Sequence, residues 1–405
     1  MFLLVSGVLI VTSLLFMTKS QNLFIPFAFL TWLSGLNFSV SSVTIRYDLF
    51  AAIVIAVIEF KTPKHPKNTD PAVRKFRSQS YHWMIYWLLF AILVTIILST
   101  AKLVGLWNLV QYSLGIFSLI LISKSHRKFE YVQALSRASF LFSIIYVLTI
   151  VISFNDLNFG ITSRYFYSDN GSFQGLSIER NILASQALIM LALNLYYRKQ
   201  LKKFGWFTNV LLLIIVVIGQ TRATWIAFAC IILIYSFGVR NLMLRAILAL
   251  TCAILAAFYS SQSYRATFSN DQFANLLNID SSTGAYRLSI YSQALSEVFS
   301  DWRRFLFGFG FGSYGEMHPI DRTGVQSEYL SSIWVGVLHS TGIIGLYLFI
   351  RSLVSTVKQA KLRTEAAAMV FGLAICASTT SPMLLQFPWI ALGIVSRKAI
   401  EKSSA

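Results

Sequence analysis

The chain has 405 residues, of which 56% are hydrophobic and only 12% are charged, and its mean hydropathy is positive. This composition excludes an ordinary soluble globular domain and indicates a polytopic helical membrane protein. The net charge of +18 does not call for nucleic acid as a partner, because the cytoplasmic loops of membrane proteins collect lysine and arginine.

Apolar runs long enough to cross about 30 Å of hydrocarbon recur along the chain and predict about 12 or 13 transmembrane helices. The first run lacks the basic region and cleavage site of a signal peptide, so we expect it to be retained. We expect one integral membrane domain over residues 1–405, because no repeat or Pro-rich linker divides it. The predicted spans lie near 2–17, 23–40, 44–60, 81–100, 104–123, 138–154, 182–197, 206–219, 225–238, 244–260, 329–350, 365–379 and 382–396.

The connections between these spans are alternately rich and poor in basic residues. Placing the most basic connection, residues 61–77, in the cytoplasm puts every other basic connection there as well. The basic residues left on the outer side are Arg46, Lys102, Arg164, Arg180, Arg222, Arg265, Arg287, Arg303, Arg304 and Arg322. All but one are arginine, whose planar guanidinium matches phosphate oxygens. The outer face is therefore predicted to bind a phosphate-bearing ligand, with no metal or other cofactor.

The long outer connection, residues 260–328, is predicted to form a large periplasmic loop with short amphipathic helices. Arg287 lies in one such segment and either faces a cavity or rests at the membrane surface. Arg222, between two apolar runs, either binds a ligand or reaches toward the interface as helix-end arginines do. The run Gly308 to Gly312 alternates glycine with phenylalanine and predicts a close-packed turn, since no strand-helix unit of a dinucleotide site surrounds it.

The span that follows residue 328 carries polar groups into the bilayer. Glu328 and His339 are 11 residues apart, so they share a helix face with Ser332 between them. We expect His339 to hydrogen-bond to another helix and Glu328, nearer the outer surface, to face a cavity. His318 is either a solvent-exposed loop residue or a general base.

The chain resembles the bacterial O-antigen ligase and O-antigen/exopolysaccharide polymerase superfamily in four segments between residues 180 and 345. They occur in the family's order and are Arg180-Asn181-Ile182-Leu183-Ala184, Thr221-Arg222-Ala223-Thr224, Tyr286-Arg287-Leu288 with Tyr291 and the run Phe307 to Tyr314, and Ser327-Glu328-Tyr329-Leu330 followed by Gly342-Ile343-Ile344-Gly345. The resemblance implies a GT-C-like membrane glycosyltransferase in the bacterial inner membrane. Its active site would face the periplasm, and its substrate would be a glycan linked to undecaprenyl pyrophosphate.

This resemblance implies a role for the outer arginines. Arg222 and Arg287, assisted by Arg180, would grip the pyrophosphate, while Glu328 or His318 takes the proton of the acceptor hydroxyl. His339, Arg265 and Tyr291 would support the site. Besides membrane lipids, a chain-length regulator and a flippase protein are the expected partners.

One departure from the family affects the choice of reaction. Members commonly carry a His-Asn pair before the Glu-Tyr-Leu stretch, and that histidine is the expected catalytic group of the ligases. Here the two positions are Gln326 and Ser327. This favours a polymerase that moves the growing chain onto the next lipid-linked repeat unit. The alternatives are a ligase that transfers glycan to lipid A-core and a flippase for lipid-linked oligosaccharides.

Overall fold

Helices make up nearly all of the described chain. The computed structural model describes residues 20–40, 43–61, 71–154, 175–177, 179–219, 222–238, 283–319, 330–359, 364–379 and 384–396. Its α-helices are α2 (Phe24–Trp32), α3 (Phe50–Lys61), α4 (Pro71–Leu98), α5 (Lys102–Lys124), α6 (Lys128–Phe154), α8 (Arg180–Tyr196), α9 (Arg198–Ile218), α10 (Arg222–Gly238), α13 (Thr283–Phe299), α14 (Trp302–Phe307), α15 (Ser313–Met317), α16 (Ile333–Gln359), α17 (Thr364–Thr379) and α18 (Gln386–Val395).

Several of these helices suit a lipid bilayer. Three segments are long and apolar enough to cross it, namely Lys102–Lys124, Lys128–Ile152 and Ile333–Ser355. Four shorter apolar helices accompany them, and large apolar side chains such as Leu103, Leu148 and Tyr347 are exposed on the outside of the bundle. In water this exposure would be costly, whereas in lipid it is expected. The protein is an α-helical membrane protein; the predicted spans 2–17 and 244–260 lie outside the described residues.

The predicted spans 23–40 and 44–60 are wrong where they approach each other, because residues 37–40 and 43–46 form strands and not helices. Helix α2 ends at Trp32, and strand β1 (Asn37–Val40) pairs antiparallel with strand β2 (Val43–Arg46) before the 3-10 helix η2 (Tyr47–Leu49). β-branched residues favour this hairpin, and apolar content alone does not distinguish a short strand from a helix. Arg46, the last residue of the hairpin, forms an ion pair with Asp48 at 3.0 Å and donates a hydrogen bond to the Leu384 carbonyl at 2.6 Å.

Two long helices extend beyond the spans predicted for them. Helix α4 begins at Pro71, ten residues before the predicted span, and helix α16 continues to Gln359. Both extensions are rich in polar and charged residues. Hydropathy marks where a helix meets hydrocarbon, whereas the helix itself ends where its backbone hydrogen bonds end.

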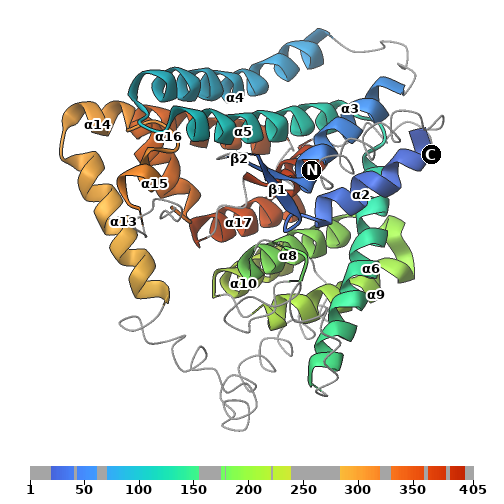
Figure 1. The fold of residues 1–405 in the computed structure, drawn as a ribbon. Coiled ribbons are helices and arrows are strands. Elements are labelled where there is room, and N and C mark those ends of the chain that lie inside the picture. Colours follow the sequence, from blue (N-terminus) through green and yellow to red (C-terminus); the bar gives the residue numbers. More distant parts are fainter. Residues whose placement is uncertain are drawn as a thin grey trace.

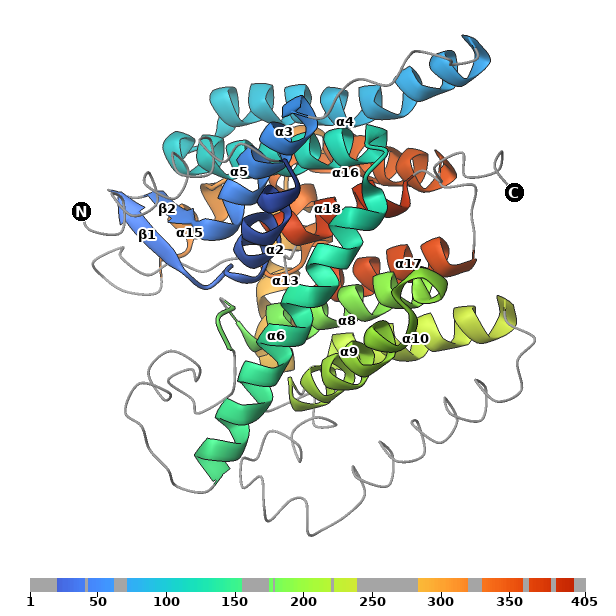
Figure 2. The same cartoon turned by 90° about the vertical axis from the view of Figure 1, so that its right-hand side faces the viewer.

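The helices form two groups around a buried centre. In Figure 1, α4 and α5 lie along the upper side, α8, α9 and α10 lie along the lower side, and α17 lies between them. Figure 2 shows α6 crossing obliquely over α2 and α9, both of which it contacts. Helix α18, whose residues are all buried, packs against α5 and α8.

Helix α13 lies at one side of the bundle, where it packs against α14 and α16. In Figure 1 it runs from α14 downward, toward the side of the molecule where α8 and α10 lie.

Candidate functional site

Three arginines stand at or near the beginnings of three helices. Arg180 is the first residue of α8, Arg222 is the first residue of α10, and Arg287 lies in the second turn of α13. Burial lowers the pKa of Arg180, and the neighbouring positive charge of Arg287 lowers it further, while Glu179 opposes both effects. The charge of Arg287 therefore acts on Arg180, although the two residues are more than 100 positions apart in the sequence.

The backbone at Arg222, where α10 begins, lies near the beginning of α8. Gly219, at the end of α9, lies so close to α8 that a β-carbon there would be 2.7 Å from the β-carbon of Ala184. On α17, Cys376 lies within hydrogen-bonding reach of both Ser185 of α8 and Thr224 of α10. The first turns of α8 and α10 are thus side by side, whereas the side chain of Arg222 lies outside the described part of the chain.

This arrangement is electrostatically suited to an anion. A helix carries partial positive charge at its N-terminus, where its first backbone N–H groups lack partners within the helix. Cations are favoured at the opposite end, so arginines at the starts of α8 and α10 add like charge to like charge. A phosphate group bound between Arg180 and Arg287 would relieve that repulsion and accept hydrogen bonds from both guanidinium groups.

A second polar cluster lies farther along α13. The carboxylate of Glu297 accepts a hydrogen bond from Nε2 of His318 at 2.8 Å and another from Nε2 of His339 at 3.1 Å. His318 follows α15, and His339 lies in the first half of α16. One carboxylate therefore ties three separate elements together. We call Glu297, His318 and His339 the Glu297 bridge.

Both nitrogens of the His318 ring are engaged. The side-chain amide of Gln293 lies 3.2 Å from Nδ1, which accepts from it, so the ring carries its proton on Nε2 and donates to Glu297. A ring in this state has no free lone pair with which to take a proton from a substrate. Solvent exposure alone does not describe His318 either, because it is a partner in a hydrogen-bonded bridge.

His339 behaves as predicted for a histidine that joins helices. It is 1% exposed, with Phe309 stacked on its ring at 4.6 Å and Tyr314 edge-on at 5.1 Å. The guanidinium group of Arg304 lies over the Phe309 ring, 4.4 Å from its centre. Nδ1 of His339 is buried without a hydrogen-bond partner among the described residues.

The glycine-phenylalanine run packs closely against α16, as predicted. Gly342 has φ 63°, which interrupts the helix, so the carbonyls of His339 and Ser340 are free for other donors. The backbone N–H groups of Phe309 and Gly310 fill this gap, at 2.9 Å and 2.8 Å respectively. Gly308 also has positive φ and lies against the α16 backbone, where a β-carbon would be 2.6 Å from the His339 carbonyl oxygen.

The other predicted site residues are placed as follows. Tyr291 packs α13 against the beginning of α16, and its hydroxyl lies 2.5 Å from that of Ser331. Glu328 and Arg265 lie outside the described residues. Arg46 belongs to the hairpin ion pair and not to the arginine group.

Sequence reasoning missed Glu297, although a signal was present. Ile290, Ala294 and Glu297 follow helical spacing, and the first two are buried against Tyr314. A carboxylate on the buried stripe of an amphipathic helix is costly unless it is paired. That cost could have predicted a partner for Glu297, but which residue supplies it depends on tertiary structure.

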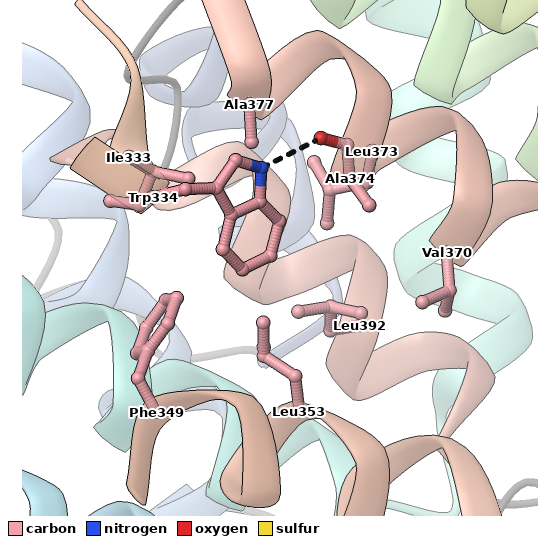
Figure 3. Close-up of a pocket in the computed structure, with 9 residues that line it drawn as sticks. All are labelled: Ile333, Trp334, Phe349, Leu353, Val370, Leu373, Ala374, Ala377 and Leu392. Carbon is pink, nitrogen blue, oxygen red and sulfur yellow. Dashed lines mark hydrogen bonds between the residues drawn. The ribbon is translucent and has the colours of Figure 1, made fainter. Parts of the chain in front are cut away.

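A small cavity lies away from both clusters. It has a volume of about 30 Å³ and is enclosed by apolar side chains of α16, α17 and α18 (Figure 3). Trp334 at its edge donates to the Ala374 carbonyl at 3.3 Å. The cavity is too small and too apolar for a glycan. In the part of the chain that the structure describes, no group of three His, Cys, Asp or Glu side chains could hold a metal ion.

Comparison with known families supports a function for this region. Residues 207–350 match the family described as O-antigen ligase. The match includes Arg222, Arg287 and the whole Glu297 bridge, and it begins after Arg180. No match was found among curated proteins.

Proposed function

From the O-antigen ligase family domain at residues 207–350, we propose that the protein is a polysaccharide polymerase of the O-antigen ligase and polymerase superfamily. It would move a growing glycan from undecaprenyl pyrophosphate onto the next lipid-linked repeat unit, at the periplasmic face of the inner membrane. The observation that carries this proposal is that α8 and α10, which begin at Arg180 and Arg222, lie side by side, and that the charge of Arg287 acts on Arg180. Like charges are held together there, where a lipid pyrophosphate would compensate them.

The arginines would act on the leaving group. In the reaction the acceptor hydroxyl attacks the anomeric carbon, a new glycosidic bond forms, and the bond to the pyrophosphate oxygen breaks. Negative charge then develops on the phosphate oxygens, and preorganised guanidinium groups stabilise it most in the transition state. Arg222, Arg287 and Arg180 are assigned this task.

A base must take the proton from the attacking hydroxyl group. Of the two predicted bases, His318 has both ring nitrogens engaged, which favours Glu328. Gln326 and Ser327, in place of the His-Asn pair, favour a polymerase over a ligase. The matched family's own description supports the ligase as the second candidate. A flippase is the third, and the concentration of arginine at one end of the bundle argues against it.

The test is to replace Arg222 with lysine in the producing cell and to measure surface polysaccharide length. Lysine keeps the charge but loses the planar fork, so long chains should disappear while the protein level stays normal. Arg303→Lys is the matched control, because Arg303 is exposed on α14, where its side chain lies over the Trp302 ring. Normal chain length in Arg222→Lys would remove Arg222 from the mechanism.

Deleting the gene separates polymerase from ligase. Lipid A-core that carries a single repeat unit indicates a lost polymerase. Bare core with accumulated lipid-linked polymer indicates a lost ligase instead.

A further inference from the structure

Helix α13 carries Arg287 near one end and Glu297 near the other. The two residues are ten positions apart in the sequence, which corresponds to about 15 Å along a helix. A phosphate held at Arg287 is therefore out of reach of Glu297. The two residues are nevertheless mechanically linked, because they share one rigid helix of 17 residues.

The contacts of α13 differ in how firmly they fix its orientation. Ile290 and Ala294 pack against Tyr314, and apolar contacts of this kind are not directional. The carboxylate of Glu297 uses both of its oxygens, one on His318 and one on His339, and each bond requires its own geometry. Gln293, one turn away, adds a bond to the same His318 ring. The bridge therefore fixes the rotation of α13 about its axis.

We propose that Glu297 is a positioning residue that holds Arg287, on the same helix, in place for pyrophosphate binding. The inference rests on the proposed function, because it takes the pyrophosphate as the ligand of the arginines. A rotation of α13 by about 20° would move a side-chain tip about 6 Å from the helix axis by about 2 Å. Misplacements of about 1 Å can reduce rates by about 10²-fold. The bridge thus acts on binding through the position of Arg287.

The experiment measures binding of undecaprenyl pyrophosphate, without a glycan, to the full-length protein in lipid nanodiscs. The proteins compared are the wild type, Glu297→Gln, Arg287→Lys and the double variant. Glutamine keeps the size of Glu297 but presents an amide N–H₂ to one of the two histidine N–H groups. We expect each single substitution to raise Kd by roughly tenfold. The double variant should bind within about twofold of Arg287→Lys, because residues that act through one another are not additive.

Two controls distinguish positioning from general damage. Glu316→Gln removes an equal charge from the exposed surface of α15 and should leave Kd unchanged. If Glu297→Gln does not fold, His318→Leu removes only one half of the bridge and should raise Kd by about threefold. His318→Gln, which restores a donor to Glu297, should return Kd to the wild-type value.

The outcomes separate the two proposals. Wild-type binding by Arg287→Lys would contradict the proposed function, since pyrophosphate would not use that guanidinium. Weakened binding by Arg287→Lys with wild-type binding by Glu297→Gln would overturn only the positioning inference. Multiplied effects in the double variant would overturn it as well, because Glu297 would then act independently of Arg287.

Discussion

The two polar clusters on α13 differ in how their charges are balanced. At Arg180, the first residue of α8, the positive charge of Arg287 adds to that of the guanidinium, and Glu179 opposes it. Around Glu297, one carboxylate faces two histidines under a cover formed by Phe309 and Tyr314. Under the proposed function, an anion from outside would bind to the first cluster, whereas the hydrogen bonds of the second cluster are made within the protein. One is suited to a substrate and the other to holding helices together.

The two clusters therefore affect the stability of the fold in opposite directions. Keeping Arg180 charged beside Arg287 is unfavourable, because burial and like charge both lower its pKa. That cost is present at every pH below the lowered pKa and disappears only as the pH rises through it. The Glu297 bridge, in contrast, stabilises the fold and gives a ligand nothing to bind. Substitutions at the arginines should therefore lower activity without lowering stability, whereas substitutions of Glu297 should affect binding only through the position of Arg287.

The largest effect is expected from Arg287→Ala. Losing a preorganised donor to the leaving group should reduce kcat/KM by about 10²- to 10³-fold. The melting temperature should stay the same or rise, because the repulsion with Arg180 is removed. Polymer formation by the purified protein and thermal unfolding of the same sample test both parts. A matching loss of activity and stability would mean that Arg287 is structural.

The second-largest effect is expected on stability from Gly342→Ala, at the kink that leaves the carbonyls of His339 and Ser340 open to other donors. In Gly342→Ala, the β-carbon would lie 2.3 Å from the backbone of Leu306, at a φ of 63°. Backbone cannot move aside as a flexible side chain can, so we expect a loss of about 3 kcal/mol or more. Thermal unfolding of the purified protein measures it.

Gly336→Ala in the same helix is the matched control. Its β-carbon would meet Leu330 at 3.7 Å, an ordinary contact, so stability should be kept or slightly increased. Equal behaviour of the two variants would show that the kink is not needed.

Much of this comparison could be predicted from the sequence. Apolar runs located most of the helices, and the assignment of Arg180, Arg222 and Arg287 to one outer face remains a prediction. The alternation of glycine and phenylalanine predicted a close-packed turn, and Gly308, Gly310 and Gly312 in that run all have positive φ angles. These features depend on local composition and on the physics of single residues.

Other features depended on contacts between distant segments. Helical phase alone pairs His339 with Glu328, whereas the structure pairs it with Glu297, 42 residues away on another helix. The hairpin of residues 37–46 was missed because its apolar content satisfies a helix as well as a strand. In both cases, several partners agree with the local pattern, and tertiary packing selects one.

A smaller effect is expected from ligand-induced stabilisation. Undecaprenyl pyrophosphate at about 100 times its Kd should stabilise the wild type by about 2.7 kcal/mol. The stabilisation should be lost in Arg180→Gln, whose unliganded form should be no less stable than the wild type. It should persist in Glu316→Gln. Thermal unfolding in nanodiscs with and without the lipid measures these shifts, and an equal shift in Arg180→Gln would place the anion elsewhere.

The smallest effect is expected from His318→Gln, which asks whether the second cluster contributes chemistry as well as structure. The glutamine amide can donate to Glu297 as the imidazole does, so kcat should change by less than about threefold. A general base would instead lose about 10²- to 10⁴-fold, together with one limb of the pH–rate profile. Measuring kcat between pH 5 and 9 in both proteins decides between them. A large loss would show that His318 leaves Gln293 when the acceptor binds, and the two clusters would then form one active site.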